Sequence, residues 1–280
     1  MLGRKFSVEN GTISYTQLLR EDLGIFRVTP DNGVPDFKAG QFLTLGLPLD
    51  SRIVNRAYSI TSSPQNKNFF EFVIRWVRRP LPGRLTSLLF NAKEGDKISW
   101  AKPAGNLTIN DTLPNGEKDT RRIVCIGGGT GLAPFVSFAQ HLHDTNDKRE
   151  IVILHGASYV DELSYKQLLT DLENESIDKG KNKWNFTYRA AISRPDEWTN
   201  RSWVGHKGRI EQFLRPTDSG KSALEELVGE KITKENTIFY VCGWQGTIDG
   251  TMDYLTNKDF VTEKNKREDG SFEVKFESYG

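Results

Sequence analysis

Cysteine and histidine are both scarce in this sequence of 280 residues. The two cysteines, Cys125 and Cys242, lie far apart, which excludes a disulfide framework and any four-cysteine zinc or iron–sulfur site. Of the four histidines, His141 and His143 are separated by one residue of an expected helix and would point away from each other. We therefore assign no metal site, and we expect a reducing, cytoplasmic compartment.

An excess of charge and a long apolar run are also missing. The chain has 38 basic and 37 acidic side chains, a net charge of +1, which argues against nonspecific binding to nucleic acid. No stretch of about 18 consecutive apolar residues occurs, and the N-terminus lacks the apolar segment of a secretory signal. We expect neither a membrane span nor export by that route.

Short strands separated by turn residues characterise the region from Ile13 to about Leu107. Since a chain of this length favours two domains, we assign this region to a small antiparallel β-barrel. The segment "FEFVIRWV" alternates and predicts one buried face with Phe70, Phe72, Ile74 and Trp76. Its other, partly polar face would comprise Glu71, Val73, Arg75 and Val77. A short helix is expected over Leu85–Asn91.

The polar segment Asn110–Arg121 contains proline, asparagine and glycine and predicts a solvated loop between folding units. We place the domain boundary there, with residues 1–114 as the β-barrel domain and residues 115–280 as an α/β domain. Beyond the loop, strand-like and helix-like segments alternate, including a helix from Leu132 to about His143. This alternation predicts a parallel sheet with crossover helices.

The segment "IGGGTGLAP" joins a buried strand to that helix. Glycines let the backbone approach a diphosphate, and the first N–H groups of a helix favour negative charge. Gly129, Thr130 and Gly131 are therefore candidate nucleotide-binding residues, the alternative being a tight strand-to-helix turn. The pattern differs from the usual dinucleotide fingerprint, since Pro134 follows where a third glycine is expected.

The end of the next strand bears on the choice between NADH and NADPH. A site for NADH usually closes this strand with an acidic residue that binds the ribose hydroxyls. Here Ser158 and Tyr159 follow "ILHGA". The absence of an acidic residue disfavours NADH.

Four motifs, in order and spacing, resemble the ferredoxin–NADP reductase superfamily. They are "RAYSITSSP" from Arg56, "GRLTSLL" from Gly83, "GGGTGLAP" from Gly127 and "YVCGWQGTIDGTM" from Tyr240. The resemblance extends from about Ile13 to Tyr279, and the final "FESYG" is similar to the aromatic-containing tail of the bacterial ferredoxin (flavodoxin)–NADP reductases. The sequence contains no ferredoxin, haem or hydroxylase module, unlike multidomain relatives.

The resemblance implies an FAD site in the β-barrel domain. Arg56 would pair with the diphosphate through its guanidinium, Tyr58 would stack on the isoalloxazine, and Ser59 would lie near the flavin N5 atom. Further FAD contacts are implied for Ala57, Val73, Arg75, Gly83, Arg84, Leu85 and Thr86. An alternative role, a basic rim that docks an acidic protein, is open for Arg75, Arg78, Arg79 and Arg84.

The resemblance also implies a site for NADPH in the α/β domain. Ser193, Arg194 and Arg209 would surround the 2′-phosphate, because hydroxyl and guanidinium donors suit a dianion. Ser158 is counted in the same site, although enterobacterial members carry an additional arginine there. The preference for NADPH over NADH is therefore expected to be less steep than in those members.

On the nicotinamide side, the resemblance implies roles for Cys242 and Gly243. The alternative for Cys242 is a small, buried apolar residue. The tail residues Glu277 and Tyr279 would return to the flavin, Tyr279 as a stacking ring and Glu277 as a proton or charge partner.

The implied activity is hydride transfer between NADP(H) and FAD, followed by single-electron transfer to an acidic carrier, ferredoxin or flavodoxin. The catalytic candidates are Tyr58, Ser59, Cys242 and Glu277, and a monomer is expected. One alternative is an NADH-dependent reductase of a cytochrome or an oxygenase. Another is a regulatory module that binds flavin without turnover, against which the intact candidate residues argue.

Overall fold

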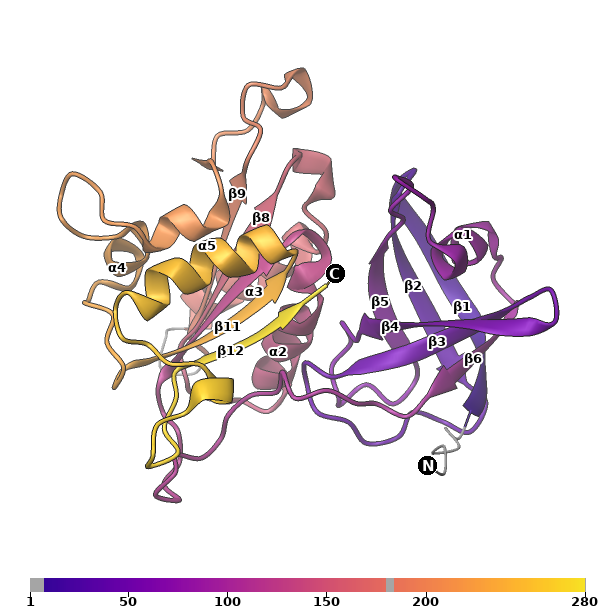
Figure 1. Ribbon diagram of the computed structural model, residues 1–280, viewed down its shortest axis with the longest axis horizontal. Coiled ribbons are helices and arrows are strands. Elements are labelled where there is room, and N and C mark those ends of the chain that lie inside the picture. Colours follow the sequence, from indigo (N-terminus) through magenta and orange to yellow (C-terminus); the bar gives the residue numbers. More distant parts are fainter. Residues whose placement is uncertain (1–7, 180–183, 280) are drawn as a thin grey trace. The chain divides into compact units, whose positions relative to one another are not determined.

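The computed structural model describes residues 8–179 and 184–279. By backbone proximity the chain divides into two compact units, coloured by sequence in Figure 1. The first unit comprises Met1–Thr108 with Val136–Asp144, and the second comprises Ile109–Phe135 with Thr145–Gly280. The domain boundary after residue 114 stays a prediction.

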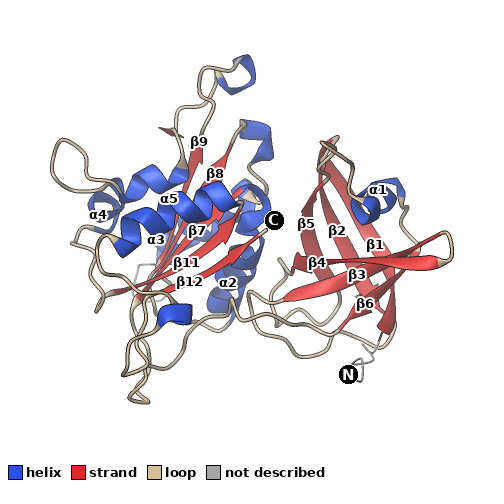
Figure 2. Cartoon of the chain, viewed as in Figure 1, coloured by secondary structure: helices blue, strands red, loops and turns tan. Residues whose placement is uncertain are grey.

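The first unit is built on an antiparallel sheet with the strand order β4-β3-β6-β1-β2-β5. Its strands are β1 (Val8–Arg20), β2 (Leu23–Pro30), β3 (Phe42–Leu49), β4 (Arg52–Ser59), β5 (Phe70–Arg75) and β6 (Lys97–Ala101). The register of β1 against β2 shifts twice, so this long strand bends as it pairs with both β2 and β6. Figure 2 shows the curved sheet and α1 (Arg84–Asn91), which buries Leu85 and Leu89 in the core. The predicted antiparallel barrel-like unit and its helix are confirmed.

The alternation predicted for β5 is wrong. Glu71 and Val73, expected on the partly polar face, are 8% and 4% exposed. The chain that follows β4 lies against β5 here, since the Glu71 N–H donates to Ser62 Oγ at 3.2 Å and the Thr61 hydroxyl donates to the Glu71 carboxylate at 3.5 Å. The Glu71 carboxylate also accepts a hydrogen bond from Arg27 Nε at 2.7 Å. The buried carboxylate is paired with a partly exposed arginine of another strand, β2, a relation that the pattern of β5 alone does not contain.

The second unit is built on a parallel sheet with the strand order β10-β9-β8-β7-β11-β12. Its strands are β7 (Arg122–Gly128), β8 (Ile151–Ala157), β9 (Phe186–Ile192), β10 (His206–Lys207), β11 (Thr237–Gly243) and β12 (Val274–Ser278). The α-helices that begin in it are α2 (Ala133–Asp144), α3 (Lys166–Lys179), α4 (Ala223–Val228) and α5 (Gln245–Thr256). Short 3-10 turns are η1 (Gly129–Leu132), η2 (Val160–Glu162), η3 (Trp198–Asn200), η4 (Ile210–Leu214) and η5 (Glu263–Asn265).

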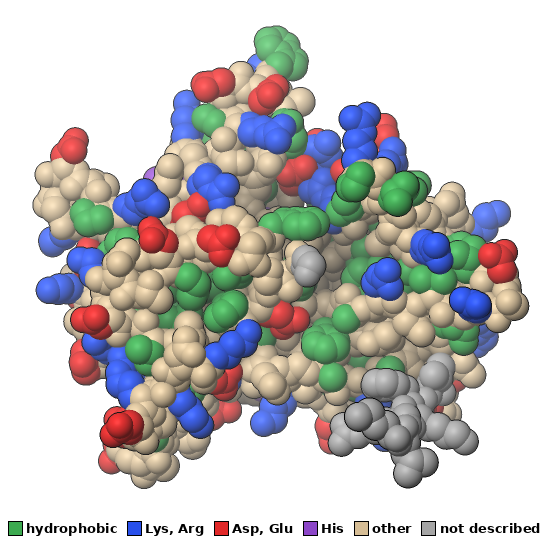
Figure 3. Space-filling model, viewed as in Figure 1, with side chains coloured by type: hydrophobic (Ala, Val, Ile, Leu, Met, Phe, Trp, Pro, Cys, Tyr) green, Lys and Arg blue, Asp and Glu red, His purple; other side chains and the backbone are tan. Residues whose placement is uncertain are grey.

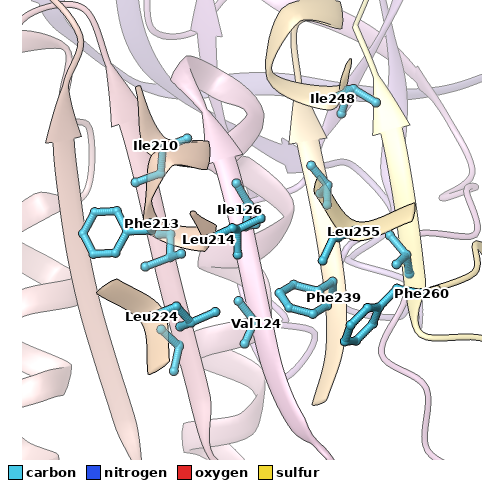
Figure 4. Close-up of a cluster of buried hydrophobic side chains, with 14 of the residues drawn as sticks. Val124, Ile126, Ile210, Phe213, Leu214, Leu224, Phe239, Ile248, Leu255 and Phe260 are labelled. Atoms are coloured by element: carbon cyan, nitrogen blue, oxygen red, sulfur yellow. The ribbon is translucent and has the colours of Figure 1, made fainter. Parts of the chain in front are cut away.

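The core of the second unit explains why its central strands do not alternate. Every residue of β7 and β11 is buried, as in parallel strands that are covered on both faces. In Figure 4, side chains of η4, α4 and α5 converge on one face of these strands, represented by Leu214, Leu224 and Leu255 around Val124 and Phe239. The predicted α/β sheet is confirmed.

Two parts of the second unit differ from expectation. The loop expected over Asn110–Arg121 is not fully solvated, because Asp119 is completely buried and pairs with Arg121 at 2.7 Å. Arg149 fixes the loop further by donating to the Asn110 carbonyl at 2.8 Å. The chain's last segment forms a strand that was not predicted from the sequence, since β12 extends the sheet parallel to β11.

Candidate functional site

The predicted nucleotide-binding residues lie along one edge of the second unit's sheet. The strands are parallel, so their carboxyl ends meet at this edge. The chain runs from β7 outward to β10 and then returns to the other side of β7 with β11 and β12. The strand order therefore reverses between β7 and β11, and ligands of open α/β sheets bind outside the carboxyl ends at such a reversal.

At this reversal, the glycine loop after β7 packs closely against the end of β11 and the start of α5. A side chain on Gly131 would overlap the Cys242 carbonyl, and one on Gly128 would overlap Thr247. These glycines are required by the turn itself. Gly129 differs: its φ is +57°, and a Cβ built on it would meet no described atom within 4 Å. Gly129 thus leaves open space beside the backbone, as the approach of a diphosphate requires.

Strand β12 brings the chain's C-terminal segment to the end of β11. Glu277 lies opposite Cys242 in the register, and the Tyr279 N–H donates to the Gly243 carbonyl at 3.0 Å. Burial raises the pKa of the Cys242 thiol and that of the Glu277 carboxyl. Cys242 is fully buried and is therefore a neutral thiol at neutral pH, suited to packing more than to nucleophilic attack.

The segments that follow β8 and β9 meet each other. Arg194 Nη1 donates to Tyr159 Oη at 2.8 Å, and the guanidinium lies 5.4 Å from the centre of the Tyr159 ring. The Ser193 N–H donates to the Ala157 carbonyl at 2.9 Å. The structure therefore brings Ser158, Ser193 and Arg194 together at neighbouring strand ends.

Sequence reasoning missed Glu162 at this place. Its Oε2 accepts hydrogen bonds from the backbone N–H groups of Ser158 and Tyr159, at 3.1 and 3.3 Å. An acidic side chain thus does lie at the end of β8, contributed by η2 and not by the strand. The signal in the sequence was a glutamate three residues after Tyr159, the spacing of a helix-capping carboxylate.

Arg209 faces a different neighbour. It follows β10, forms an ion pair with the buried Glu211, and its Nη2 donates to the Gly246 carbonyl at 2.8 Å. Its guanidinium thus points to the start of α5, whereas that of Arg194 points to Tyr159. The two arginines lie on neighbouring strand ends but make separate contacts.

His155 lies under the glycine loop. It is opposite Gly127 in the register of β7 and β8, it is completely buried, and its Nδ1 is 3.1 Å from Tyr188 Oη. Burial lowers the pKa of His155 to about 4, so the imidazole is neutral at neutral pH. It is a core histidine, as expected.

In the first unit, the flavin motif lies on β4. The Tyr58 ring packs on the core cluster that contains Leu85 and Leu89 of α1. The Tyr58 hydroxyl is buried without a hydrogen-bond partner among the described residues, and burial raises its pKa. Arg56 is exposed and donates to the Asn55 carbonyl at 2.8 Å. Of the other motif residues, Ala57 is exposed and Ser59 is buried.

The N-terminus of α1 lies on the same cluster and is not capped. Gly83 precedes the helix, and no side chain of the described residues caps its first N–H groups. The hydroxyls of Thr86 and Ser87 instead donate to the Gly83 carbonyl, at 3.0 and 2.8 Å. Free N–H groups at a helix N-terminus form a site for an anion such as a diphosphate. The motif on β4 and the motif at the start of α1, both implied for FAD, therefore pack on the same core cluster.

The four arginines of the proposed basic rim are not equivalent. Arg75 pairs with Asp22 at 2.9 Å, and Arg78 pairs with Glu21 at 3.4 Å while its guanidinium covers the Trp76 ring. Arg79 and Arg84 are exposed and have no partner among the described residues. On the face in Figure 3, basic and acidic side chains are interspersed.

These observations test whether the residues fit the two implied cofactors. The unpartnered Tyr58 hydroxyl and the uncapped α1 fit a ligand that combines a polar chain with a diphosphate, as FAD does. The open side of Gly129 at the strand-order reversal fits a dinucleotide. Val73, also implied for FAD, is buried in β5. Within the described residues, no group of three His, Cys, Asp or Glu side chains is arranged for a metal ion, and no helix is long and apolar enough to span a membrane.

Two protein families match the two parts of the chain. Residues 11–109 match the oxidoreductase FAD-binding domain, and residues 125–253 match the oxidoreductase NAD-binding domain. These ranges include the β4 motif, the α1 motif, the glycine loop and the end of β11. The match therefore covers all four motifs.

Individual relatives agree with this division. The chain is 31% identical over 221 residues to a ferredoxin–NADP reductase of Azotobacter vinelandii, covering 78% of each chain. It is 29% identical over 219 residues to a flavodoxin/ferredoxin–NADP reductase of Escherichia coli, covering 78% of this chain and 79% of the relative. Among solved structures, a ferredoxin NADP+ reductase from Neisseria gonorrhoeae with bound FAD and NADP superposes with a TM-score of 0.75 at 22% identity, covering 97% of this chain and 98% of that one.

Proposed function

Because this chain belongs to the ferredoxin–NADP reductase family, we propose that it passes electrons between NADP(H) and a one-electron protein carrier, ferredoxin or flavodoxin. It is an oxidoreductase with an FAD-binding and an NAD(P)-binding domain. When bound, FAD supplies the chemistry that couples a two-electron hydride transfer to single-electron steps. The protein's own residues bind, orient and shield the reacting groups.

In the first unit, Arg56 and the N-terminus of α1 hold the FAD diphosphate, and Tyr58 stacks on the isoalloxazine. The proposal is supported by the uncapped helix and by the buried, unpartnered Tyr58 hydroxyl, which a bound ligand would satisfy. Ser59, Ala57, Val73, Arg75 and Arg84 complete the proposed site.

In the second unit, the predicted nucleotide-binding residues lie together at the carboxyl ends of six parallel strands, on both sides of the strand-order reversal. This observation is the main support for the proposal, because ligands of open α/β sheets bind at such a reversal. The glycine loop receives the diphosphate of NADP(H) on the open side of Gly129. Ser158, Ser193, Arg194 and Arg209 receive the 2′-phosphate.

At the end of β11 and β12, the nicotinamide is proposed to approach the backbone of Gly243. Cys242 packs beneath it as a neutral thiol. Glu277 has a pKa raised by burial, so its carboxyl holds a proton to a higher pH than an exposed glutamate would. We assign to Glu277 the role of proton or charge partner and to Tyr279 that of a stacking ring.

The carrier, the compartment and the oligomeric state remain proposals. An acidic ferredoxin or flavodoxin is proposed from the relatives' names and from exposed arginines of the first unit. A cytoplasmic compartment is proposed from the low cysteine content, and a monomer is proposed as the oligomeric state. A second candidate, an NADH-dependent reductase, is favoured by the Glu162 carboxylate at the end of β8.

Anaerobic reduction of the purified yellow protein with NADPH and with NADH in parallel tests the proposal. NADPH is expected to bleach the flavin absorbance faster at equal, subsaturating concentration. A screen of ferredoxin, flavodoxin and cytochrome acceptors follows. Faster reduction by NADH would favour the second candidate, and a protein that takes up no FAD would contradict both.

A further inference from the structure

Asn200 joins the two segments that carry the proposed 2′-phosphate site. It is the last residue of η3, in the long connection between β9 and β10, and it is 1% exposed. We propose that Asn200 is a positioning residue that sets the protein's recognition of the 2′-phosphate of NADP(H). This inference rests on the proposed NADP(H) site and assigns it a residue outside the four motifs.

The side-chain amide of Asn200 bonds both segments at once. Its Nδ2 donates to the Ser158 carbonyl at 2.9 Å and to the Arg194 carbonyl at 2.7 Å. Its Oδ1 accepts from the Val160 N–H at 2.9 Å. Both donor hydrogens and the carbonyl oxygen are therefore used. The chain after β8 is tied to the chain after β9 by one buried amide.

These bonds hold both members of the Arg194–Tyr159 pair. Asn200 fixes the backbone of Arg194 directly, and it fixes Tyr159 from both sides through Ser158 and Val160. The guanidinium of Arg194 is then directed by its own bond to Tyr159 Oη. A guanidinium fork binds phosphate oxygens well only in a fixed orientation, so a loose backbone would weaken this contact.

A residue with the same chemistry elsewhere in the sheet provides the control. Asn236 precedes β11, at the amino ends of the strands, opposite to the proposed site. Its Nδ2 donates to the Lys231 carbonyl at 2.9 Å, and its Oδ1 accepts from the Thr233 N–H at 2.9 Å. Asn236→Ala therefore removes a comparable loop-fixing amide without touching the segments after β8 and β9.

Calorimetric titration of the FAD-loaded protein with 2′,5′-ADP and with 5′-AMP tests the inference without turnover. Asn200→Ala is expected to weaken binding of 2′,5′-ADP by about tenfold or more, because two carbonyls lose buried hydrogen bonds and the pair they hold is released. Binding of 5′-AMP should change by less than about threefold, since it makes no 2′-phosphate contact. Asn236→Ala should leave the ratio of the two affinities unchanged.

Steady-state kinetics supply the second readout. In Asn200→Ala, KM for NADPH should rise with kcat unchanged, since the phosphate is remote from the hydride. Asn200→Ser replaces the amide with a single hydroxyl, which can keep at most part of the hydrogen bonds, and should give an intermediate effect. It serves in place of the alanine variant if that variant does not fold. A loss shared equally between both ligands, or a ratio changed equally by Asn236→Ala, would overturn the inference.

Arg194→Ala in the same titration distinguishes a failure of the proposed 2′-phosphate site from a failure of the proposed role of Asn200. If it removes the preference for 2′,5′-ADP while the Asn200 variants keep that preference, only the role of Asn200 is wrong. If the unmodified protein binds 2′,5′-ADP no better than 5′-AMP, the proposed 2′-phosphate site is wrong and the role of Asn200 is rejected with it.

Discussion

The two units differ in how far their proposed binding groups are already satisfied by the protein. In the first unit, the Tyr58 hydroxyl is buried without a partner among the described residues, and the N-terminus of α1 has no cap. In the second unit, Arg194 is bonded to Tyr159, and Arg209 is bonded to Glu211 and to the Gly246 carbonyl. Apart from Arg56, which donates to the Asn55 carbonyl, these groups of the first site have unmet hydrogen bonds, whereas the arginines of the second site have contacts to exchange.

This difference has a consequence for affinity. A ligand that satisfies buried, unpartnered groups gains the full benefit of each hydrogen bond, whereas a ligand that displaces existing partners gains only the difference. The first unit is therefore suited to a cofactor that stays bound, and the second to one that is exchanged in each turnover. A resident FAD and an exchangeable NADP(H) match these properties.

The largest expected effect concerns the exchangeable ligand. Replacing Arg194 and Arg209 together with alanine should lower kcat/KM for NADPH on the order of a hundredfold or more, since each charge-assisted contact contributes roughly 1.5–3 kcal/mol. The loss should lie mainly in KM, and NADH should change little. Steady-state kinetics with both nucleotides measure the ratio.

The structure adds a necessary control to this experiment. Arg209 neutralises Glu211, which is 6% exposed, so its removal leaves a buried carboxylate unpaired. Glu211→Gln should therefore be added to the double variant to restore stability. Retention of the NADPH/NADH ratio in the resulting stable triple variant would show that the 2′-phosphate is bound elsewhere.

The second prediction concerns acid stability, which should also differ between the units. The fully buried His155 of the second unit has a pKa of about 4, against 6.5 ordinarily, and burial also lowers the pKa of His206 in the same unit. Between these two pH values the His155 imidazole is protonated in the unfolded chain but stays neutral in the folded protein. Stability should therefore fall as the pH drops from 6.5 to 4, by up to about 3 kcal/mol.

His155→Gln tests this assignment, because the glutamine carbonyl can still accept a hydrogen bond from Tyr188 but does not titrate. Urea unfolding, followed at several pH values between 7 and 4, should show a smaller loss of stability in the variant than in the unmodified protein. Equal slopes in the two proteins would mean that other groups cause the acid sensitivity.

In both units the sequence predicts features that depend on local patterns. The glycine loop, the parallel sheet and the α1 helix follow from such patterns, and the structure confirms them. Residues whose roles depend on distant partners were missed: Glu71 is buried because Arg27 pairs with it, and Glu162 reaches Ser158 from a separate turn. Asn200 belongs to no motif, since two of its three partners, Ser158 and Val160, come from a segment some forty residues away.

The third prediction addresses the site with unmet hydrogen bonds. Arg56→Ala should raise the dissociation constant of FAD by about ten- to a hundredfold, because one charge-assisted contact to the diphosphate is lost. Arg52→Ala is the matched control, an exposed arginine on the same strand, β4. Fluorescence titration of the apoprotein with FAD measures both. An equal effect of the two variants would remove Arg56 from the diphosphate site.

The smallest expected effect is on the association rate of the electron carrier. It tests whether the carrier binds to the first unit. Reversing the charges of Arg78 and Arg79 should lower the association rate of an acidic carrier by roughly tenfold at low salt, because long-range attraction accelerates encounter. NADPH reduction of the flavin should not change. Arg78 is paired with Glu21, whereas Arg79 is not paired among the described residues, so reversal of Arg79 alone should produce the larger part of the effect.

A net-charge control decides this prediction. Arg215→Glu with Lys221→Glu alters the overall charge by the same amount, at exposed positions of the second unit. Stopped-flow measurements at several ionic strengths should show that the first pair of reversals slows association and flattens its salt dependence, while the second pair does so only weakly. If both pairs slow the reaction equally, the carrier senses only the charge of the whole protein. If the second pair has the larger effect, docking belongs to the second unit, and the basic rim of Arg75, Arg78, Arg79 and Arg84 has no part in it.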